Sequence, residues 1–356
     1  MTIYFGLLLI ILFLCLFIGK NNLHNNVILI IIVSLIFIFM GFRENFTPDY
    51  SNYEDVFNKI SHGSGDEMIR MELGFIWLNS LLTSYRDVII VISMFFCFSL
   101  FFSFKKFILP KFWWLGFLIL FLNINFLLGN ISGMRSCIVT SAYIFAINFQ
   151  ILKKPLLYIF TLLGLSLFHT SALMLMPFVI ITNKNMSSNN KFIIFLIIFV
   201  FATISTFFPD VINSYTLDFI KNYFDKYEVY MQEGINVKIT FFSLTRIILI
   251  LFLLYQTINN IHNNLSDSSK IMMKYSILYF ILLLAPGIGL ISRFYYYLTF
   301  PFIIGTIYSF SAIRKNVIKY SFISGVFLII LYDLYNFTNN PIYSLYYLLY
   351  NSTLFK

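Results

Sequence analysis

His169 is the residue of this sequence whose chemistry can be read most directly, because it lies near the middle of a long apolar run bracketed by lysines, residues 153–184. Imidazole titrates near neutral pH, so a histidine can take the proton of a hydroxyl group at pH 7. A histidine at a helix break is also often only a cap or a satisfied core residue, and the sequence leaves both interpretations open. The other histidines, His24, His62 and His262, lie in separate loops, so no metal site is predicted.

The arginines are the second group of interest, since a guanidinium binds phosphate through paired hydrogen bonds. Arg135 opens an apolar run, Arg246 lies inside one and Arg293 follows one. A charge at such a depth in an apolar environment costs several kcal/mol unless it is paired, so it marks an ion pair or the path of a charged ligand. Pairing with carboxylates such as Glu72 or Asp87 would explain these arginines without a ligand. The alternative is an anion held by several arginines, such as a pyrophosphate.

The elements that must position these side chains are membrane-spanning helices. The chain has 356 residues, of which 60% are hydrophobic and 11% are charged. Apolar runs long enough for a bilayer core of about 30 Å recur from end to end. A spanning backbone must satisfy its own hydrogen bonds, and the alternating pattern of a membrane barrel is absent. The sequence therefore predicts an all-α, polytopic transmembrane helix bundle, with residues 1–356 forming a single integral membrane domain.

About 11–12 spans are expected, including one broken or re-entrant helical pair. The predicted segments are 2–19, 26–42, 87–104, 112–128, 136–152, the two short arms 154–168 and 171–182, and then 192–208, 240–258, 273–290, 296–313 and 317–335.

The distribution of charge predicts where the chain turns back. Lysines cluster between the apolar runs, whereas nearly all carboxylates fall in two segments, 43–86 and 209–238. Cytoplasmic loops carry an excess of Lys and Arg. Every lysine cluster lies on the cytoplasmic side only if the arms 154–168 and 171–182 turn back at His169 instead of crossing as one helix. We therefore expect that turn, with both chain ends and both acidic segments outside, and most arginines then lie toward the outer side.

The two acidic segments, 43–86 and 209–238, interleave Tyr and Phe with charged residues. Aromatic rings stack on the C–H faces of sugars while carboxylates and amides bind the hydroxyl groups, so these extracytoplasmic loops suit a sugar ligand. An aromatic belt at the lipid interface accounts for part of the same rings. The short apolar stretch 71–83 is expected to form an interfacial or re-entrant helix.

Several short motifs follow one another in the first half of the chain. They are Gly41, Phe42 and Arg43, then Asp49, Tyr50 and Tyr53, then Glu72, Gly74 and Phe75, then Arg135, and finally the run from Leu167 to Leu173 around His169. In this order they resemble the EpsG family of exopolysaccharide and O-antigen polymerases, the Wzy-type proteins. The second half resembles the family only in general character, through Arg293 and a Tyr-rich tail, 341–350.

The resemblance implies a multi-pass enzyme of the bacterial inner (cytoplasmic) membrane whose active site faces the periplasm. Such an enzyme is a glycosyltransferase that works without metal, cofactor or nucleotide sugar. It would join undecaprenyl-pyrophosphate-linked oligosaccharide repeat units, donor to acceptor, by inverting glycosyl transfer, in the synthesis of O-antigen, capsule or exopolysaccharide. Its partners would be the two lipid-linked substrates, the lipid bilayer and a chain-length regulator, with no nucleic acid.

Within that expectation the candidate residues take roles. His169 and Arg135 are the candidate catalytic residues, with His169 taking a hydroxyl proton or orienting the pyrophosphate. Preplaced guanidinium groups stabilise the charge that develops on a departing phosphate oxygen. The candidate pyrophosphate-binding residues are Arg135, Arg246 and Arg293, and the candidate sugar-binding residues are Asp49, Tyr50, Tyr53 and Glu72.

Three other activities fit part of the pattern. A lipid-linked oligosaccharide flippase would also carry arginines, although paired or inverted halves are typical of transporters and no internal repeat is found. A membrane O-acyltransferase uses a histidine, but its donor is usually cytoplasmic and His169 is expected near the outside. An O-antigen ligase shares the glycosyl-transfer chemistry and differs in its acceptor.

Overall fold

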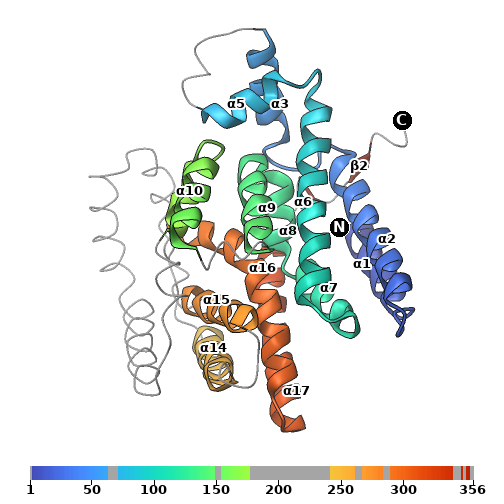
Figure 1. Ribbon diagram of the computed structural model, residues 1–356, viewed down its shortest axis with the longest axis vertical. Coiled ribbons are helices and arrows are strands. Elements are labelled where there is room, and N and C mark those ends of the chain that lie inside the picture. The colour runs from blue at the N-terminus through green and yellow to red at the C-terminus, as the bar shows by residue number, and fades with distance from the viewer. Residues whose placement is uncertain are drawn as a thin grey trace, which may run out of the picture. The chain divides into compact units, whose positions relative to one another are not determined.

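The computed structural model of the protein describes residues 2–62, 71–148, 154–176, 241–260, 267–283, 289–339, 346–347 and 350–352 (Figure 1). The chain divides into two compact units, one formed by Met1–Ile181 with Ile330–Lys356 and the other by Thr182–Ile329. The predicted all-α membrane bundle is confirmed. The prediction of a single integral domain stays a prediction.

The first unit holds most of the described helices. They are α1 (Thr2–Cys15), α2 (Asn22–Gly41), α3 (Tyr50–Ser61), α5 (Leu73–Ser80), α6 (Tyr85–Phe107), α7 (Trp113–Leu122), α8 (Ile124–Ser132), α9 (Met134–Asn148) and α10 (Pro155–Ser166), with the 3-10 helices η1 (Pro110–Phe112) and η3 (Thr170–Leu175). Two short strands, β1 (Arg43–Glu44) and β2 (Asn351–Ser352), pair antiparallel.

The second unit contains α14 (Phe241–Asn260), α15 (Asp267–Leu283) and α16 (Gly289–Ala312), and α17 (Asn316–Asn339) continues from it into the first unit.

Within the described residues, three helices are long and apolar enough to cross a membrane, namely α2, α6 and α17, or up to four if a bent pair counts as one span. Helices α1, α9 and α10 are apolar but shorter. The predicted segment 192–208 lies outside the described residues, so the count of 11–12 spans stays a prediction.

The expected span over 112–128 falls on a bent pair of helices. Pro110–Leu122 and Phe126–Ser132 meet at an angle of 58°. Asn123 ends α7 and precedes α8 with a non-helical backbone, φ −77° and ψ 71°. A short amide side chain competes for backbone hydrogen bonds and so favours breaks over helix interiors. After this bend, α8 ends at Ser132, and α9 begins at Met134 directly after Gly133.

Helix α6 is the long element of the first unit and runs between α9 and α2 (Figure 1). It begins with a capping box, in which Ser84 Oγ accepts from the amide of Asp87 and the Asp87 carboxylate accepts from the amide of Ser84. It ends with Lys105 and Lys106 in its last turn. Acidic residues at the start and basic residues at the end of a helix match its dipole. Asp87, Lys105 and Lys106 are therefore placed where the helix dipole favours their charges.

The chain turns back at His169, as expected. Tyr158 on α10 donates a hydrogen bond through its hydroxyl to the carbonyl of Leu175 on η3, at 2.7 Å. In one continuous helix these residues would lie about 25 Å apart, at 1.5 Å per residue. The remainder of the second arm, 177–182, lies outside the described residues.

The C-terminal segment lies beside the end of α2. Arg43 pairs with Ser352 across the two strands, and the Tyr350 hydroxyl donates to the carbonyl of Phe39 at 2.7 Å. The Tyr350 ring also stacks on Phe39, with centroids 4.8 Å apart. The acidic segment that follows α2 and the C-terminal segment are therefore at the same end of this unit.

Candidate functional site

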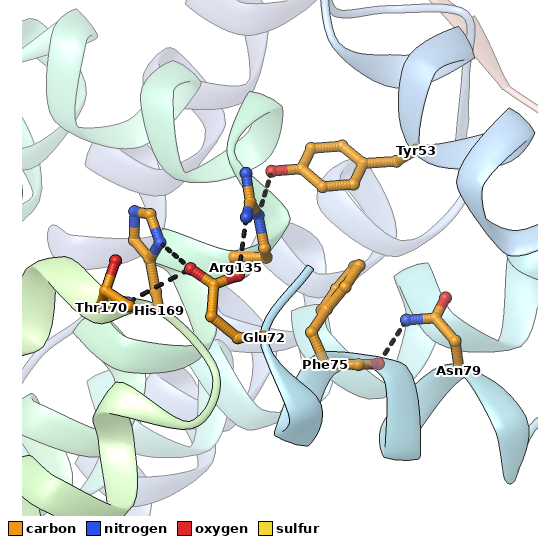
Figure 2. Close-up of polar contacts among 7 residues, drawn as sticks. All are labelled: Tyr53, Glu72, Phe75, Asn79, Arg135, His169 and Thr170. Carbon is orange, nitrogen blue, oxygen red and sulfur yellow. Dashed lines mark hydrogen bonds and ion pairs between the residues drawn. The ribbon is translucent and has the colours of Figure 1, made fainter. Parts of the chain in front are cut away.

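The site is built around the carboxylate of Glu72, which joins three segments that are far apart in the sequence (Figure 2). Its Oε2 accepts a hydrogen bond from Arg135 Nη1 at 2.7 Å. Its Oε1 lies 3.2 Å from His169 Nδ1 and 3.3 Å from the backbone nitrogen of Thr170. One carboxylate therefore contacts both candidate catalytic residues.

The local structure explains why each side chain faces the others. Glu72 directly precedes α5, Arg135 lies in the first turn of α9, and His169 precedes η3 with an extended backbone, φ −158° and ψ 117°. The first turn of a helix carries a partial positive charge, so an arginine there is unfavourable without an acid beside it. The Glu72 carboxylate supplies that acid, which fixes the start of α9 against α5.

The site is partly covered, and each of its three charged side chains keeps some exposure to solvent. The side chains of His169 and Glu72 are 12% and 13% exposed, and that of Arg135 is 24% exposed. Ion pairs are strengthened where water is partly excluded. The pair between Arg135 and Glu72 is therefore stronger than a pair on an open surface.

Tyr53 completes the contacts of Arg135. Its hydroxyl accepts from Arg135 Nε at 3.4 Å, and the guanidinium carbon lies 5.9 Å from the ring centroid. The ring meets Phe75 edge to face, with centroids 5.6 Å apart. Burial raises the pKa of the Tyr53 phenol, although Arg135 opposes this shift. Tyr53 is therefore a neutral phenol at physiological pH that holds the guanidinium in place.

Glu72 itself is ionised at neutral pH. Burial alone raises the pKa of this carboxyl, but the hydrogen bond with His169 and the charge of Arg135 lower it to about 2, from an ordinary value of 4.5. The carboxylate therefore serves this site as a fixed negative charge and not as a proton donor.

A second acid, Asp49, directly precedes α3 and contacts the junction between α8 and α9. Its Oδ2 accepts from the hydroxyl of Ser132 at 2.7 Å. Ser132 ends α8 three residues before Arg135. Asp49 and Glu72 therefore contact the junction between α8 and α9 at two points, Ser132 and Arg135. Ser132 was not among the predicted site residues, and its only signal in the sequence is a small polar residue before Gly133.

Two further residues of the motifs serve packing. Arg43 is 5% exposed, and its guanidinium donates to the carbonyl of Met40 and, at 2.7 Å, to the carbonyl of Ile131. Tyr50, a predicted sugar-binding residue, is buried with its ring edge-to-face on Tyr85 at 5.1 Å. In this geometry both residues hold helix ends together, and a contact of Tyr50 with sugar stays a prediction.

The EpsG family model matches residues 26–352 of this chain, nearly its whole length. The chain belongs to the EpsG family. This family is associated with exopolysaccharide biosynthesis, and the protein is a membrane protein of that family. No curated protein and no solved structure matches the chain.

The matched range of this EpsG-family protein includes every predicted site residue. The structure brings together Glu72, Arg135, His169 and Tyr53 in one cluster, and Asp49 is bonded to Ser132 at the adjoining end of α8. The remaining candidates, Arg246 on α14 and Arg293 on α16, belong to the second unit, so the expected meeting of three arginines stays a prediction.

The acidic segment 209–238 of this EpsG-family chain lies outside the described residues. Within the described ranges, no three His, Cys, Asp or Glu side chains are grouped so that they could hold a metal ion.

Proposed function

We propose that this EpsG-family protein is a Wzy-type polymerase. It joins undecaprenyl-pyrophosphate-linked oligosaccharide repeat units on the extracytoplasmic face of the bacterial inner membrane. The observation that carries the proposal is the Glu72 carboxylate, which contacts both Arg135 and His169. Glycosyl transfer from a pyrophosphate needs a base for the acceptor hydroxyl and a cation for the leaving group, and His169 and Arg135 are such groups.

The reaction forms one bond and breaks another. The oxygen of an acceptor hydroxyl attacks the anomeric carbon of the donor sugar, and the bond from that carbon to the pyrophosphate oxygen breaks. The bonding electrons leave with the pyrophosphate, and the hydroxyl proton passes to a base. A single displacement of this kind inverts the configuration at the anomeric carbon.

His169 is the proposed base. When the ring hydrogen sits on Nδ1 and is donated to Glu72 Oε1, at 3.2 Å, Nε2 is the acceptor nitrogen of the imidazole. The ionised Glu72 then fixes this tautomer and stabilises the imidazolium formed when the proton arrives. The carboxylate thus orients the base and does not itself receive the proton.

Arg135 is the proposed partner of the leaving pyrophosphate. A guanidinium has five N–H donors in a rigid fork, and the contacts with Tyr53 and Glu72 use Nε and Nη1. The other donors suit phosphate oxygens, and a charge held in place before the reaction stabilises the developing negative charge. Arg246 and Arg293 are proposed to bind the same pyrophosphate or that of the second carrier, and Asp49 and Tyr53 to bind sugar.

The distribution of charge supports an outward-facing site. Arg43 and the acidic segment after it follow the end of α2, and Lys20 precedes its start. Helix α6 likewise has Asp87 in its first turn and Lys105 and Lys106 in its last. Lysine-rich ends are typical of the cytoplasmic side, so the end with Glu72 is proposed to face outward.

The test uses purified protein in a lipid bilayer, supplied with its lipid-linked repeat unit. A ladder of polymer on a gel is the expected result, and His169→Ala should abolish it. The control is His62→Ala, which should keep the ladder because His62 is exposed at the end of α3. Unchanged substrate that moves across the bilayer would instead show a flippase. A single transfer to a different acceptor would show a ligase.

If membranes with His169→Ala still made full-length polymer, the proposed polymerase function would stand, but His169 could not be its base.

A further inference from the structure

The segment Glu72–Gly74 is bonded to the chain on both sides of His169. The amide of Gly74 donates to the carbonyl of Leu167 at 2.8 Å, two residues before the histidine. The Glu72 carboxylate accepts from the amide of Thr170 at 3.3 Å, one residue after it. Two backbone groups that flank His169 therefore set where the carboxylate lies relative to the imidazole.

Gly74 allows this approach because it has no side chain. A Cβ at position 74 would lie 2.9 Å from the Leu167 oxygen, 3.1 Å from the Leu167 carbonyl carbon and 3.2 Å from Phe168 Cδ2. The two closest atoms belong to the backbone and cannot rotate away as a flexible side chain can. Any larger residue must therefore push the start of α5 away from the turn that presents His169.

We propose that Gly74 is a positioning residue of the active site, an inference that rests on the proposed polymerase function. Its missing side chain lets the start of α5 dock on the 167–170 turn, so that Glu72 reaches His169 Nδ1. A displacement of about 1 Å at a catalytic group can cost about 100-fold in rate. Gly74 therefore acts on the reaction through Glu72 and makes no contact with substrate itself.

The first experiment compares Gly74→Ala with Gly164→Ala in the polymerisation assay. Gly164 lies near the end of α10, the helix that leads into the same turn. A Cβ added there would meet no atom within 4 Å outside its own helix backbone. We expect Gly74→Ala to lower kcat by about 10- to 100-fold with KM changed less than about 2-fold. Gly164→Ala should keep the wild-type rate, since alanine favours a helix over glycine.

A double-mutant cycle separates positioning from general damage. If Gly74 acts through the carboxylate, Gly74→Ala should cost little more in a Glu72→Gln background, because the ionised partner is already gone. Losses that multiply, as for independent sites, would overturn the inference.

If Gly74→Ala fails to fold, a second pair of variants tests the docking of Glu72 on the 167–170 turn through its other hydrogen bond, the one from the amide of Thr170. Thr170 is the first residue of η3, where proline is tolerated, and His169 has the extended backbone that a following proline requires. Thr170→Pro removes the amide that donates to Glu72, and Thr170→Ala keeps it. We expect Thr170→Pro to have a kcat about 3- to 10-fold below that of Thr170→Ala. Equal rates for the two variants would overturn the inference.

The outcomes distinguish this inference from the function on which it rests. A wild-type protein that makes no polymer would refute the polymerase. A wild-type ladder with equal rates for Gly74→Ala and Gly164→Ala would leave the polymerase standing and refute the role of Gly74.

Discussion

Arg43 and Arg135 lie at the same end of the first unit and show two different uses of one side chain. Arg43 is 5% exposed, and its hydrogen bonds go to the carbonyls of Met40 and Ile131. Arg135 is 24% exposed and pairs with the carboxylate of Glu72. The two environments thus differ both in the partner of the guanidinium and in its exposure to solvent.

The carbonyls that Arg43 contacts lie in the last turns of α2 and α8. The last turn of a helix carries a partial negative charge of about half an elementary charge, so two helix ends together balance one guanidinium. Such partners are part of the backbone and are not exchanged for a ligand. Arg43 is therefore structural, whereas Arg135 is proposed to offer its remaining donors to the pyrophosphate.

The largest expected effect is the loss of activity in Arg135→Lys. Lysine keeps the charge but lacks the planar fork, so the rate of polymer formation should fall by about 10³-fold, or about 4 kcal/mol in the barrier. Thermal unfolding in detergent should shift little, because lysine keeps a positive charge beside the carboxylate of Glu72. A rate near that of the wild type would remove the contrast between the two arginines.

The next effect is a loss of stability in Arg43→Met. The carbonyls of Met40 and Ile131 lose a charged donor, which should lower the free energy of unfolding by about 3 kcal/mol. The rate per folded molecule should stay close to the wild-type value. Arg86→Ala is the control, because Arg86 is exposed in the first turn of α6. A variant as stable as this control would show that Arg43 does not hold the helix ends together.

The third effect depends on pH and separates the two regions. The pKa of Glu72 is lowered to about 2 from 4.5, so its stabilising contribution is fully present above about pH 4.5 and is lost as the pH falls through about 2. The contribution should be on the order of 2 kcal/mol in wild type and absent in Glu72→Gln. Unfolding measured between pH 2 and 6 checks this.

The difference in free energy of unfolding between wild type and Arg43→Met should stay constant over the same pH range, because the carbonyl groups that Arg43 contacts do not titrate. A difference that varies with pH would mean that an acid also supports Arg43.

The smallest effect is expected for Ser132→Ala, which removes the hydrogen bond to Asp49 between the two arginine regions. The free energy of unfolding should fall by about 1 kcal/mol. Ser80→Ala is the control, because Ser80 is exposed and donates a hydrogen bond to the carbonyl of Trp77 on its own helix. Equal stability of the two variants would show that the hydrogen bond between Ser132 and Asp49 does not stabilise the junction between α8 and α9.

Much of the fold could be predicted because helix formation in a membrane depends on local features. The run 87–104 was expected as a span and lies inside α6, and the turn at His169 followed from the distribution of charge. The break at Asn123 was missed, since a single amide in an apolar run is as compatible with a straight helix as with a bend.

The cluster around Glu72 was predicted only in part. Glu72, Arg135 and His169 were each singled out, and pairing of Arg135 with Glu72 was left open beside anion binding. Ser132 and the docking role of Gly74 had no distinctive signal, because both depend on contacts with residues far away in the chain.

The sequence by itself determined that this chain is a helical membrane protein of the EpsG family, with its lysines and its acids at opposite ends of helices such as α6. Run length, charge and motif order are properties of neighbouring residues, so no structure was needed to find them. Only the tertiary structure decided that Glu72 joins Arg135 to His169 and that Arg43 instead binds helix ends. The reason is that a charged side chain can pair with any group of suitable charge, and packing alone brings one such group within hydrogen-bonding distance.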